Sequence, residues 1–171
     1  MRHKPQYLLT TLHMTAFHPA MDDIDRKIID LLAEDARRSL TDIGEYVGLS
    51  ASAINERIRR LVASGAVRRF TIDAAPDAMG RPVLAFVCLA LAADTDEAAF
   101  RAFAATHAAI EECHHVTGAW SYIAKVRVAS LPELEAFLAE LKARKFIARS
   151  ETIIALSSAV EASYTPKPVS P

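Results

Sequence analysis

Residues 37–70, RRSLTDIGEYVGLSASAINERIRRLVASGAVRRF, carry the clearest structural pattern in the chain. Apolar Ile43 and Val47 lie four residues apart on one side of a short helix, and Gly48 is placed to end it. Ser50 is placed to cap a second helix. The apolar side of this second helix consists of Ile54, Ile58, Leu61 and Val62. Two helices joined by so short a turn predict a helix-turn-helix.

The flanking segments extend this pattern to a small domain, residues 21–73. Upstream, Asp22 or Asp23 can cap a helix with a single apolar face. That face consists of Ile24, Ile28, Leu31 and Leu32. Downstream, Val67–Asp73 alternates as a strand with a charged outer face. Three helices followed by a strand predict a winged helix-turn-helix.

Basic residues concentrate in this domain although the whole chain has a net charge of −1. Between Arg37 and Phe70 there are seven arginines and three acidic residues, a net charge of +4. Residues 83–161 carry a net charge of −3. This asymmetry indicates a polyanion-binding module joined to a different domain.

The helix that follows Ser50 has the composition of a DNA-reading helix. A helix in the major groove needs small polar residues in its first turn and cations on its flanks. Ser50 and Ser52 supply the first, while Asn55 can read an adenine edge and Arg59 a guanine edge. The arginines expected to contact phosphates are Arg37, Arg38, Arg57, Arg60, Arg68 and Arg69. We therefore predict double-stranded DNA as a partner; the alternative is an ordinary three-helix bundle with a solvated basic face.

The second half of the chain has a different pattern. Residues 74–82 contain two prolines and Gly80 and are predicted to be a linker. Residues 83–164 then alternate between strand and helix patterns. The expected strands are 83–91, 113–117, 122–128 and 152–160, and the expected helices are 94–107 and 131–143. This β-α-β-β-α-β order predicts a ferredoxin-like domain, and the whole chain is assigned to the α+β class.

Composition limits the remaining possibilities. With 51% hydrophobic and 24% charged residues, the chain is not disordered as a whole, and no run of about 18 apolar residues predicts a membrane span. Cys88 and Cys113 lie in apolar runs, which favours buried free thiols in a reducing cytoplasm. Residues 1–20 are expected to be a disordered extension, or to precede a true start at Met21. Residues 165–171, with three prolines between Thr165 and the end, are expected to form a flexible tail.

The run Glu111–Gly118 contains the residues most suggestive of chemistry. Cys113, His114 and His115 invite a zinc hypothesis, but adjacent residues on a strand point to opposite faces and cannot all reach one ion. Glu111 and Glu112 resemble an acid–base pair, yet chain neighbours seldom aim at one substrate atom. No phosphate-binding loop, nucleophile elbow or zinc-protease motif is present in the sequence. We expect neither catalysis nor a cofactor.

Several motifs together resemble the Lrp/AsnC family of feast/famine transcriptional regulators. The first half contributes Asp22–Ile29, Asp35–Ser39, Val47–Ser50, Arg57–Leu61 and Gly65–Val67, and the second half contributes Ala85–Val87 and Glu112–Gly118. The resemblance covers about residues 22–164. It implies a winged helix joined to a domain that senses a small molecule, usually an amino acid. It also implies dimers that pair through the carboxy-terminal sheets and often assemble further, commonly into octamers.

The resemblance places the effector beside a loop whose residues here are Gly118, Ala119, Trp120, Ser121 and Tyr122. Members of the family often carry aspartates at the positions of Ala119 and Ser121, and a carboxylate is a natural partner for the ammonium group of an amino acid. This chain lacks both. Trp120 instead adds an aromatic wall that suits an apolar ligand, or packs across a dimer interface.

Three functions follow from these features. The first is a sequence-specific transcriptional regulator modulated by an amino-acid-like effector. The second is an architectural DNA-binding protein without an effector, which would show a low specificity ratio. The third is a small enzyme or metal-binding domain attached to a DNA reader. We favour the first.

Overall fold

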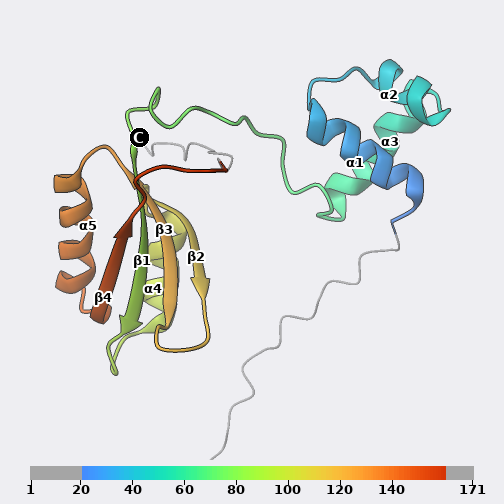
Figure 1. The fold of residues 1–171 in the computed structure, drawn as a ribbon. Coiled ribbons are helices and arrows are strands. Elements are labelled where there is room, and N and C mark those ends of the chain that lie inside the picture. Colours follow the sequence, from blue (N-terminus) through green and yellow to red (C-terminus); the bar gives the residue numbers. More distant parts are fainter. Residues whose placement is uncertain (1–20, 161–171) are drawn as a thin grey trace, which may run out of the picture. The chain divides into compact units, whose positions relative to one another are not determined.

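The computed structural model describes residues 21–160, so the predicted extension and the predicted tail lie outside the described residues. The chain divides into two compact units, one ending at Phe70 and the other beginning at Thr71 (Figure 1). No helix among the described residues is long and apolar enough to cross a membrane.

The first unit is a bundle of three helices. They are α1 (Asp23–Glu34), α2 (Leu40–Val47) and α3 (Ala51–Ala63). Each begins at a side chain that accepts a hydrogen bond from a free backbone N–H of the first turn: Asp22, Ser39 and Ser50. The buried core consists of Ile28, Leu31, Ile43, Ile54 and Leu61. These helices confirm the predicted helix-turn-helix, including the caps at Asp22 and Ser50.

The turn between α2 and α3 depends on two glycines. Gly48 ends α2 in the left-handed conformation, with φ of 76°, as predicted. Gly44 was not anticipated. A Cβ atom at this position would lie 2.4 Å from the carbonyl oxygen of Leu49. Only glycine lets the turn come this close to the helix.

The strand expected at Val67–Asp73 is not formed. Val67 N–H donates to the carbonyl of Leu61 and so closes the end of α3, and the residues from Arg68 onward have no strand conformation. A strand needs a hydrogen-bonded partner, and the described part of this unit contains only helices. The alternating pattern is therefore present without the pairing that it predicts, and Ile72 is left 70% exposed.

The second unit is a four-stranded antiparallel sheet with two helices. Its elements are β1 (Val83–Leu91), α4 (Glu97–Thr106), β2 (Ile110–His115), β3 (Tyr122–Val128), α5 (Leu131–Ala143) and β4 (Ile147–Ile154). The spatial order β2-β3-β1-β4 places the first and third strands at the centre (Figure 1). The order of elements is the predicted β-α-β-β-α-β, and the bounds of β1, β3 and α5 match the prediction.

The two helices share one face of the sheet. Ala85, Val87 and Leu89 of β1 are fully buried in the same cluster as Phe100 of α4 and Phe137 of α5. The intervening residues of each strand point to the opposite face, which no helix of this unit covers; we call it the open face. In register across β1, β3 and β4, it carries Phe86, Lys125 and Ile153.

Three element boundaries differ from the sequence prediction. The fourth strand spans Ile147–Ile154 rather than 152–160, because Lys145, with φ of 57°, turns the chain from α5 directly into the strand. It ends near the beginning of β1, since the two strands are antiparallel, Ala85 pairs with Ile154 and only two residues of β1 precede Ala85. β2 spans Ile110–His115 rather than 113–117, and α4 begins three residues later than predicted because Asp96 caps it.

Candidate nucleic-acid interface and effector loop

One side of α3 is buried and the other presents polar residues to solvent. Ile54 and Leu61 lie in the core, whereas Ser52, Asn55 and Arg59 are exposed. Ser50 Oγ accepts from the backbone N–H of Ala53 at 3.3 Å and lies 3.0 Å from Ser52 Oγ. The first turn is thus held by small side chains, which leaves its exposed side open to close approach by another molecule.

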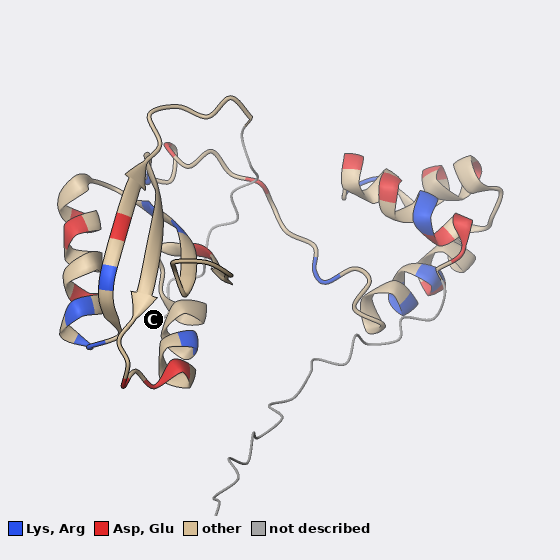
Figure 2. Cartoon of the chain, turned by 60° about the horizontal axis from the view of Figure 1, so that its bottom comes forward, with Lys and Arg blue, Asp and Glu red and all other residues tan. Residues whose placement is uncertain are grey.

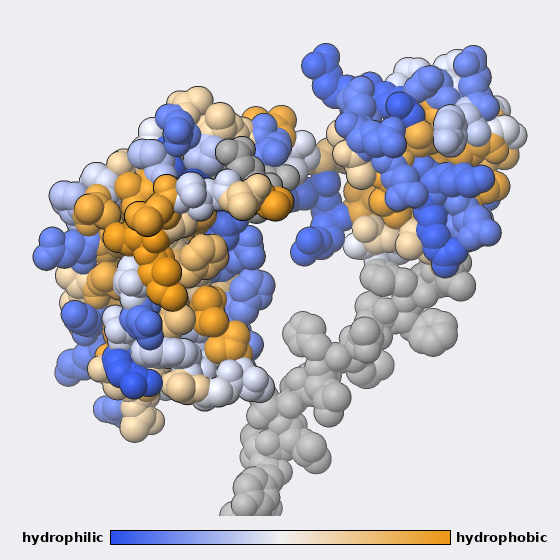
Figure 3. Space-filling view, viewed as in Figure 1, coloured by the Kyte–Doolittle hydropathy of each residue, from blue (hydrophilic) through white to orange (hydrophobic). Residues whose placement is uncertain are grey.

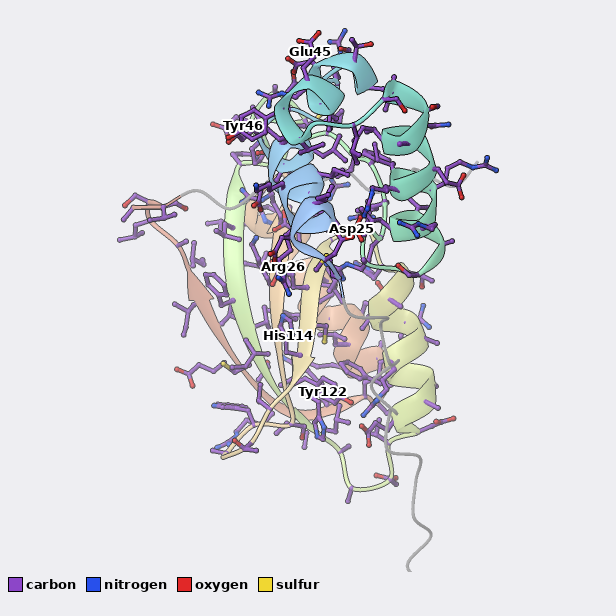
Figure 4. The ribbon with its side chains drawn as sticks, turned by 90° about the vertical axis from the view of Figure 1, so that its right-hand side faces the viewer. Asp25, Arg26, Glu45, Tyr46, His114 and Tyr122 are labelled. Carbon is purple, nitrogen blue, oxygen red and sulfur yellow. The ribbon has the colours of Figure 1, made fainter. Side chains whose placement is uncertain are left out.

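Arg57 occupies a different position from the other arginines of α3. Its Nη1 lies 2.7 Å from Asp22 Oδ2 and 2.7 Å from Asp25 Oδ1, and its side chain is 21% exposed. Asp25 points from α1 toward α3 (Figure 4). The backbone N–H of Asp25 and then the Arg57 guanidinium lower the pKa of Asp22. Arg57 therefore ties the beginning of α1 to α3.

The remaining predicted phosphate contacts fall into two groups. Arg38 lies between Glu34 at 3.5 Å and Asp42 at 3.2 Å, and is 27% exposed. The other group is exposed and forms no ion pair within residues 21–160. It consists of Arg37, Arg60, Arg68 and Arg69. Arg59 shares a feature with each group: its side chain is 75% exposed, and its Nη1 lies 4.0 Å from Glu56 Oε2. Figure 2 shows the basic segments of α3.

Tyr46 is exposed on this unit and was not singled out from the sequence. Its side chain is 70% exposed and projects from α2 on the side away from α3, next to Glu45 (Figure 4). Its position on the outer side of an amphipathic helix was visible in the sequence. The pattern gave no chemical reason to select it.

The loop between β2 and β3 is fixed by backbone hydrogen bonds. The N–H of Val116 donates to the carbonyl of Ser121 at 3.1 Å, and the N–H of Ser121 donates to the carbonyl of Leu89 at 2.8 Å. Ser121 Oγ accepts from the N–H of Leu91 at 3.1 Å. Gly118 has φ of 107°, a conformation that favours glycine. Hydrogen bonds within the protein therefore hold the backbone of the loop, and the Ser121 hydroxyl group contributes one of them.

Arg149 of β4 contacts this loop from across the sheet. Its guanidinium carbon lies 4.2 Å from the centre of the Trp120 ring, and its Nη2 donates to the carbonyl of Ala119 at 3.3 Å. Arg149 is in register with Ala90 of β1, so its side chain belongs to the open face. Sequence reasoning missed Arg149, because only the register of β4 brings it to a loop about thirty residues earlier.

Tyr122 takes a separate role from the rest of the loop. It is 4% exposed, faces the helices, and its hydroxyl donates to Glu97 Oε1 while accepting from Arg101 Nε at 2.8 Å. These contacts, the tyrosine first, lower the pKa of Glu97, and burial raises the pKa of Tyr122. His115 stacks on the tyrosine ring at 4.9 Å. The structure thus brings Ala119, Trp120 and Ser121 together near Arg149, but places the hydroxyl of Tyr122 against α4.

The run from Glu111 to His115 forms contacts within the protein. Cys113 packs against the core and burial raises the pKa of its thiol, while His114 Nε2 lies 3.2 Å from Glu112 Oε2 on the edge strand. No group of three or more potential metal-binding side chains is found among the described residues. Cys88 is buried, and Cys113 is half-buried. Figure 4 shows His114 and Tyr122 at separate places along the sheet.

Glu111 and Glu112 do converge, although not on a substrate. A bulge in β2 lets both approach Lys125 Nζ, at 3.0 and 3.3 Å, and Glu111 also pairs with Arg127 at 2.7 Å. Burial opposes the charge of Lys125, but the ion pairs with both glutamates raise its pKa overall. Both glutamates are therefore engaged in an ion-pair cluster with Lys125 and Arg127.

An apolar patch lies on the open face of the sheet. Phe86 and Ile153 are in register with each other and are 39% and 52% exposed. Figure 3 shows hydrophobic side chains gathered on this unit. Single exposed apolar residues are common on protein surfaces, whereas these two are neighbours on adjacent strands.

Comparison with known proteins agrees with this division into two units. Residues 21–62 match the family model of the AsnC-type helix-turn-helix domain, and residues 84–164 match that of the Lrp/AsnC ligand binding domain. The chain is 33% identical over 147 residues to the transcriptional regulator FL11 of Pyrococcus furiosus, covering 85% of this chain and 96% of that protein. It is 35% identical over 137 residues to the regulator LrpA of Mycobacterium tuberculosis, covering 79% and 90%.

Solved structures show the same similarity. LrpC of Bacillus subtilis matches with a TM-score of 0.72 at 28% identity, covering 82% of this chain and 98% of that one. A feast or famine regulatory protein of M. tuberculosis, complexed with L-methionine, matches with a TM-score of 0.74 at 33% identity, covering 83% and 96%.

Proposed function

Because this chain belongs to the Lrp/AsnC family of transcriptional regulators, we propose that it binds specific double-stranded DNA sequences as a homo-oligomer and responds to an amino-acid-like effector. We assign DNA binding to residues 21–73, the linker to 74–82, and sensing and assembly to 83–164. One observation carries the proposal: a single chain contains a helix-turn-helix, whose third helix presents an exposed polar side, and a ligand-binding domain.

DNA reading is assigned to the exposed side of α3. Ser50, Ser52, Asn55 and Arg59 are the proposed base-facing residues. The exposed Arg37, Arg60, Arg68 and Arg69 are proposed to bind phosphates, because no carboxylate among the described residues neutralises them. Arg57 is assigned to the stability of the domain, since its guanidinium is already held by two aspartates. Arg38, paired with Glu34 and Asp42, can reach a phosphate only by exchanging these partners.

Assembly is assigned to the open face of the sheet. One helix-turn-helix unit makes few phosphate contacts, so its isolated affinity is weak and falls steeply with salt. Pairing two chains through Phe86 and Ile153 raises the effective concentration of the second reading helix. Two-fold symmetry then predicts half-sites separated by about one helical turn of DNA, or a multiple of it. Further assembly of dimers, up to octamers, is part of the proposal.

Effector binding is assigned to Gly118–Ser121 together with the start of β3 at Tyr122. Hydrogen bonds to Ser121 and Leu89 hold the loop, and a related regulator of 33% identity has been solved with L-methionine. An effector can alter DNA binding only if it favours one assembly or conformation over another. We propose no catalytic role and no cofactor, because the relatives are named as transcriptional regulators, and we place the protein with its DNA in the cytoplasm.

Selection of bound sequences from random duplexes tests this proposal. The selected duplexes are measured again at several salt concentrations and with a panel of amino acids. A palindromic consensus whose affinity changes with one ligand supports an effector-responsive regulator. Binding that is tight but indifferent to sequence, and unchanged by every ligand, would instead show an architectural DNA-binding protein.

A further inference from the structure

The contact between Arg149 and Trp120 fixes a guanidinium group with most of its donors unused. An arginine side chain has five N–H donors, and Arg149 uses one of them, on the carbonyl of Ala119. No carboxylate forms an ion pair with Arg149 within the described residues. Because the guanidinium carbon is 4.2 Å from the Trp120 ring centre, the group is held by stacking rather than by a counter-charge.

Such a guanidinium is suited to a carboxylate. Its planar edge matches the two oxygens of a carboxylate, and stacking on an aromatic ring removes much of the entropy that binding would otherwise cost. Trp120 is only partly buried and supplies apolar surface directly beside the cation. The carboxylate of a ligand can therefore bind Arg149 while its apolar part packs against Trp120.

The same place offers little to an ammonium group. Residues 116–121 include no acidic side chain, and the hydroxyl of Ser121 is occupied by the N–H of Leu91. Glu97 is engaged with Tyr122 and Arg101 on the helix side of the sheet. Glu151 shares the open face with Arg149, but it is two residues farther along the strand, so that the two Cα atoms are about 6.6 Å apart. The Arg149 side chain extends to the loop and forms no ion pair with Glu151.

We propose that the effector site recognises an apolar carboxylate through Arg149 and Trp120, without requiring an α-ammonium group. The ligand class is a branched or aromatic carboxylic acid or 2-oxo acid, which keeps the shape of an amino acid but lacks its positive charge. This inference rests on the effector role proposed for the loop and specifies its chemistry.

Trp120 supplies the readout, because it is the single tryptophan of the chain. The full-length protein is titrated with three matched probes while tryptophan fluorescence and, independently, the heat of binding are followed. Leucine has both charged groups, isocaproate has the carboxylate alone, and isoamylamine has the ammonium alone. We expect isocaproate to bind about tenfold more tightly than leucine, and isoamylamine not to bind.

Variants separate recognition from folding. Arg149→Gln is expected to weaken isocaproate binding about tenfold or more, since it removes the cation. Arg144→Gln is the matched control: Arg144 also stacks on an aromatic ring, Phe103 at 4.9 Å, but it pairs with Glu140 and caps the end of α5. Glu151→Gln is expected to leave isocaproate affinity within about twofold, because nothing in the proposal uses that carboxylate. Ala119→Asp is expected to shift the preference toward leucine.

Several results would overturn the inference. Tighter binding of leucine than isocaproate, with leucine lost in Glu151→Gln, would show that a zwitterion is held between Arg149 and Glu151. Isocaproate affinity unchanged in Arg149→Gln, or no binding of any probe, would remove the carboxylate site. DNA affinity measured on the same samples distinguishes failure of the carboxylate site from failure of the proposed regulatory function. If DNA binding responds to an amino acid while isocaproate has no effect, the regulator stands and only the carboxylate assignment fails.

Discussion

Arg57 of α3 donates a hydrogen bond of 2.7 Å to Asp25 of α1, thirty-two positions earlier in the chain. The same nitrogen also lies 2.7 Å from Asp22, the residue that caps α1. Two helices distant in sequence are thereby held together at one end by a cation shared between two carboxylates. An arginine in the middle of a basic run is thus part of the scaffold rather than of the surface.

Replacing Arg57 by alanine should lower the stability of the first unit. The change leaves Asp25, whose side chain is 16% exposed, without its cation. We expect a loss of about 1–2 kcal/mol in the free energy of unfolding, within the range for hydrogen bonds to charged groups that are partly solvated. Urea unfolding followed by far-UV circular dichroism measures it. Arg60→Ala, at an exposed position of the same helix, should change stability by less than about 0.5 kcal/mol; equal effects of the two substitutions would contradict the assignment.

A Gly44→Ala substitution should destabilise the helix-turn-helix. The added methyl group would lie 2.4 Å from the Leu49 carbonyl, so the turn must move. We expect a cost of about 1–3 kcal/mol, as for overpacked sites. Thermal unfolding of the variant is compared with that of Glu45→Ala, the exposed neighbour. An unchanged transition for Gly44→Ala would show that the turn is less tightly packed than the structure indicates.

Glu97 should make the second unit sensitive to acid. The hydrogen bond from Tyr122 and the contact with Arg101 lower its pKa below 4.5 in the folded state, so folding favours the ionised carboxylate. This contribution is fully present above the unfolded pKa, and it is lost as the pH falls through the folded pKa. The free energy of unfolding, measured from pH 7 down to about pH 3, should therefore decrease less steeply below about pH 4.5 in Tyr122→Phe than in the native chain. Parallel profiles for the two proteins would exclude a role for this hydrogen bond.

A new charge within the apolar patch of Phe86 and Ile153 should prevent pairing of the sheets. Ile153→Glu places a carboxylate beside Phe86 in the apolar patch, where a second chain would bury it without a partner. Sedimentation at micromolar concentration should show a smaller assembly than for the native chain. Leu156→Glu is the matched control, because Leu156 is 98% exposed and lies beyond the end of β4. If Ile153→Glu assembles normally, the interface lies elsewhere.

Helical periodicity predicted the first unit well because its signals are local. Caps at Asp22 and Ser50, the left-handed Gly48 and the apolar positions of α3 all lie within a few residues of the features that they determine. The failure at Val67–Asp73 has the opposite cause. Alternation reports which side chains face solvent, but a strand also needs a partner, and the described helical unit supplies none.

The candidate site divides in the same way. Exposed polar positions of α3 follow from its period, and the loop at Gly118 follows from its turn residues. Neither the helical period nor the turn residues predict ion pairs. The sequence therefore does not distinguish Arg57 from the other arginines of α3, because its partner Asp25 lies on α1. The contact between Arg149 and Trp120 could not be predicted either, since it depends on the register of β4 against β1. The ion pair between Glu111 and Lys125 was also not predictable from the sequence, because it depends on a bulge in β2.

The measurement that most directly tests the account is DNA binding by the Arg59→Ala/Arg60→Ala double variant. Fluorescence anisotropy with a duplex selected by the native chain gives affinity at several salt concentrations, and sedimentation checks that assembly is unchanged. The account predicts that specific binding is abolished and that any residual binding has a shallower salt dependence, because phosphate contacts are lost. Unchanged affinity and an unchanged salt slope in an intact oligomer would contradict the assignment of α3 as the helix that reads DNA.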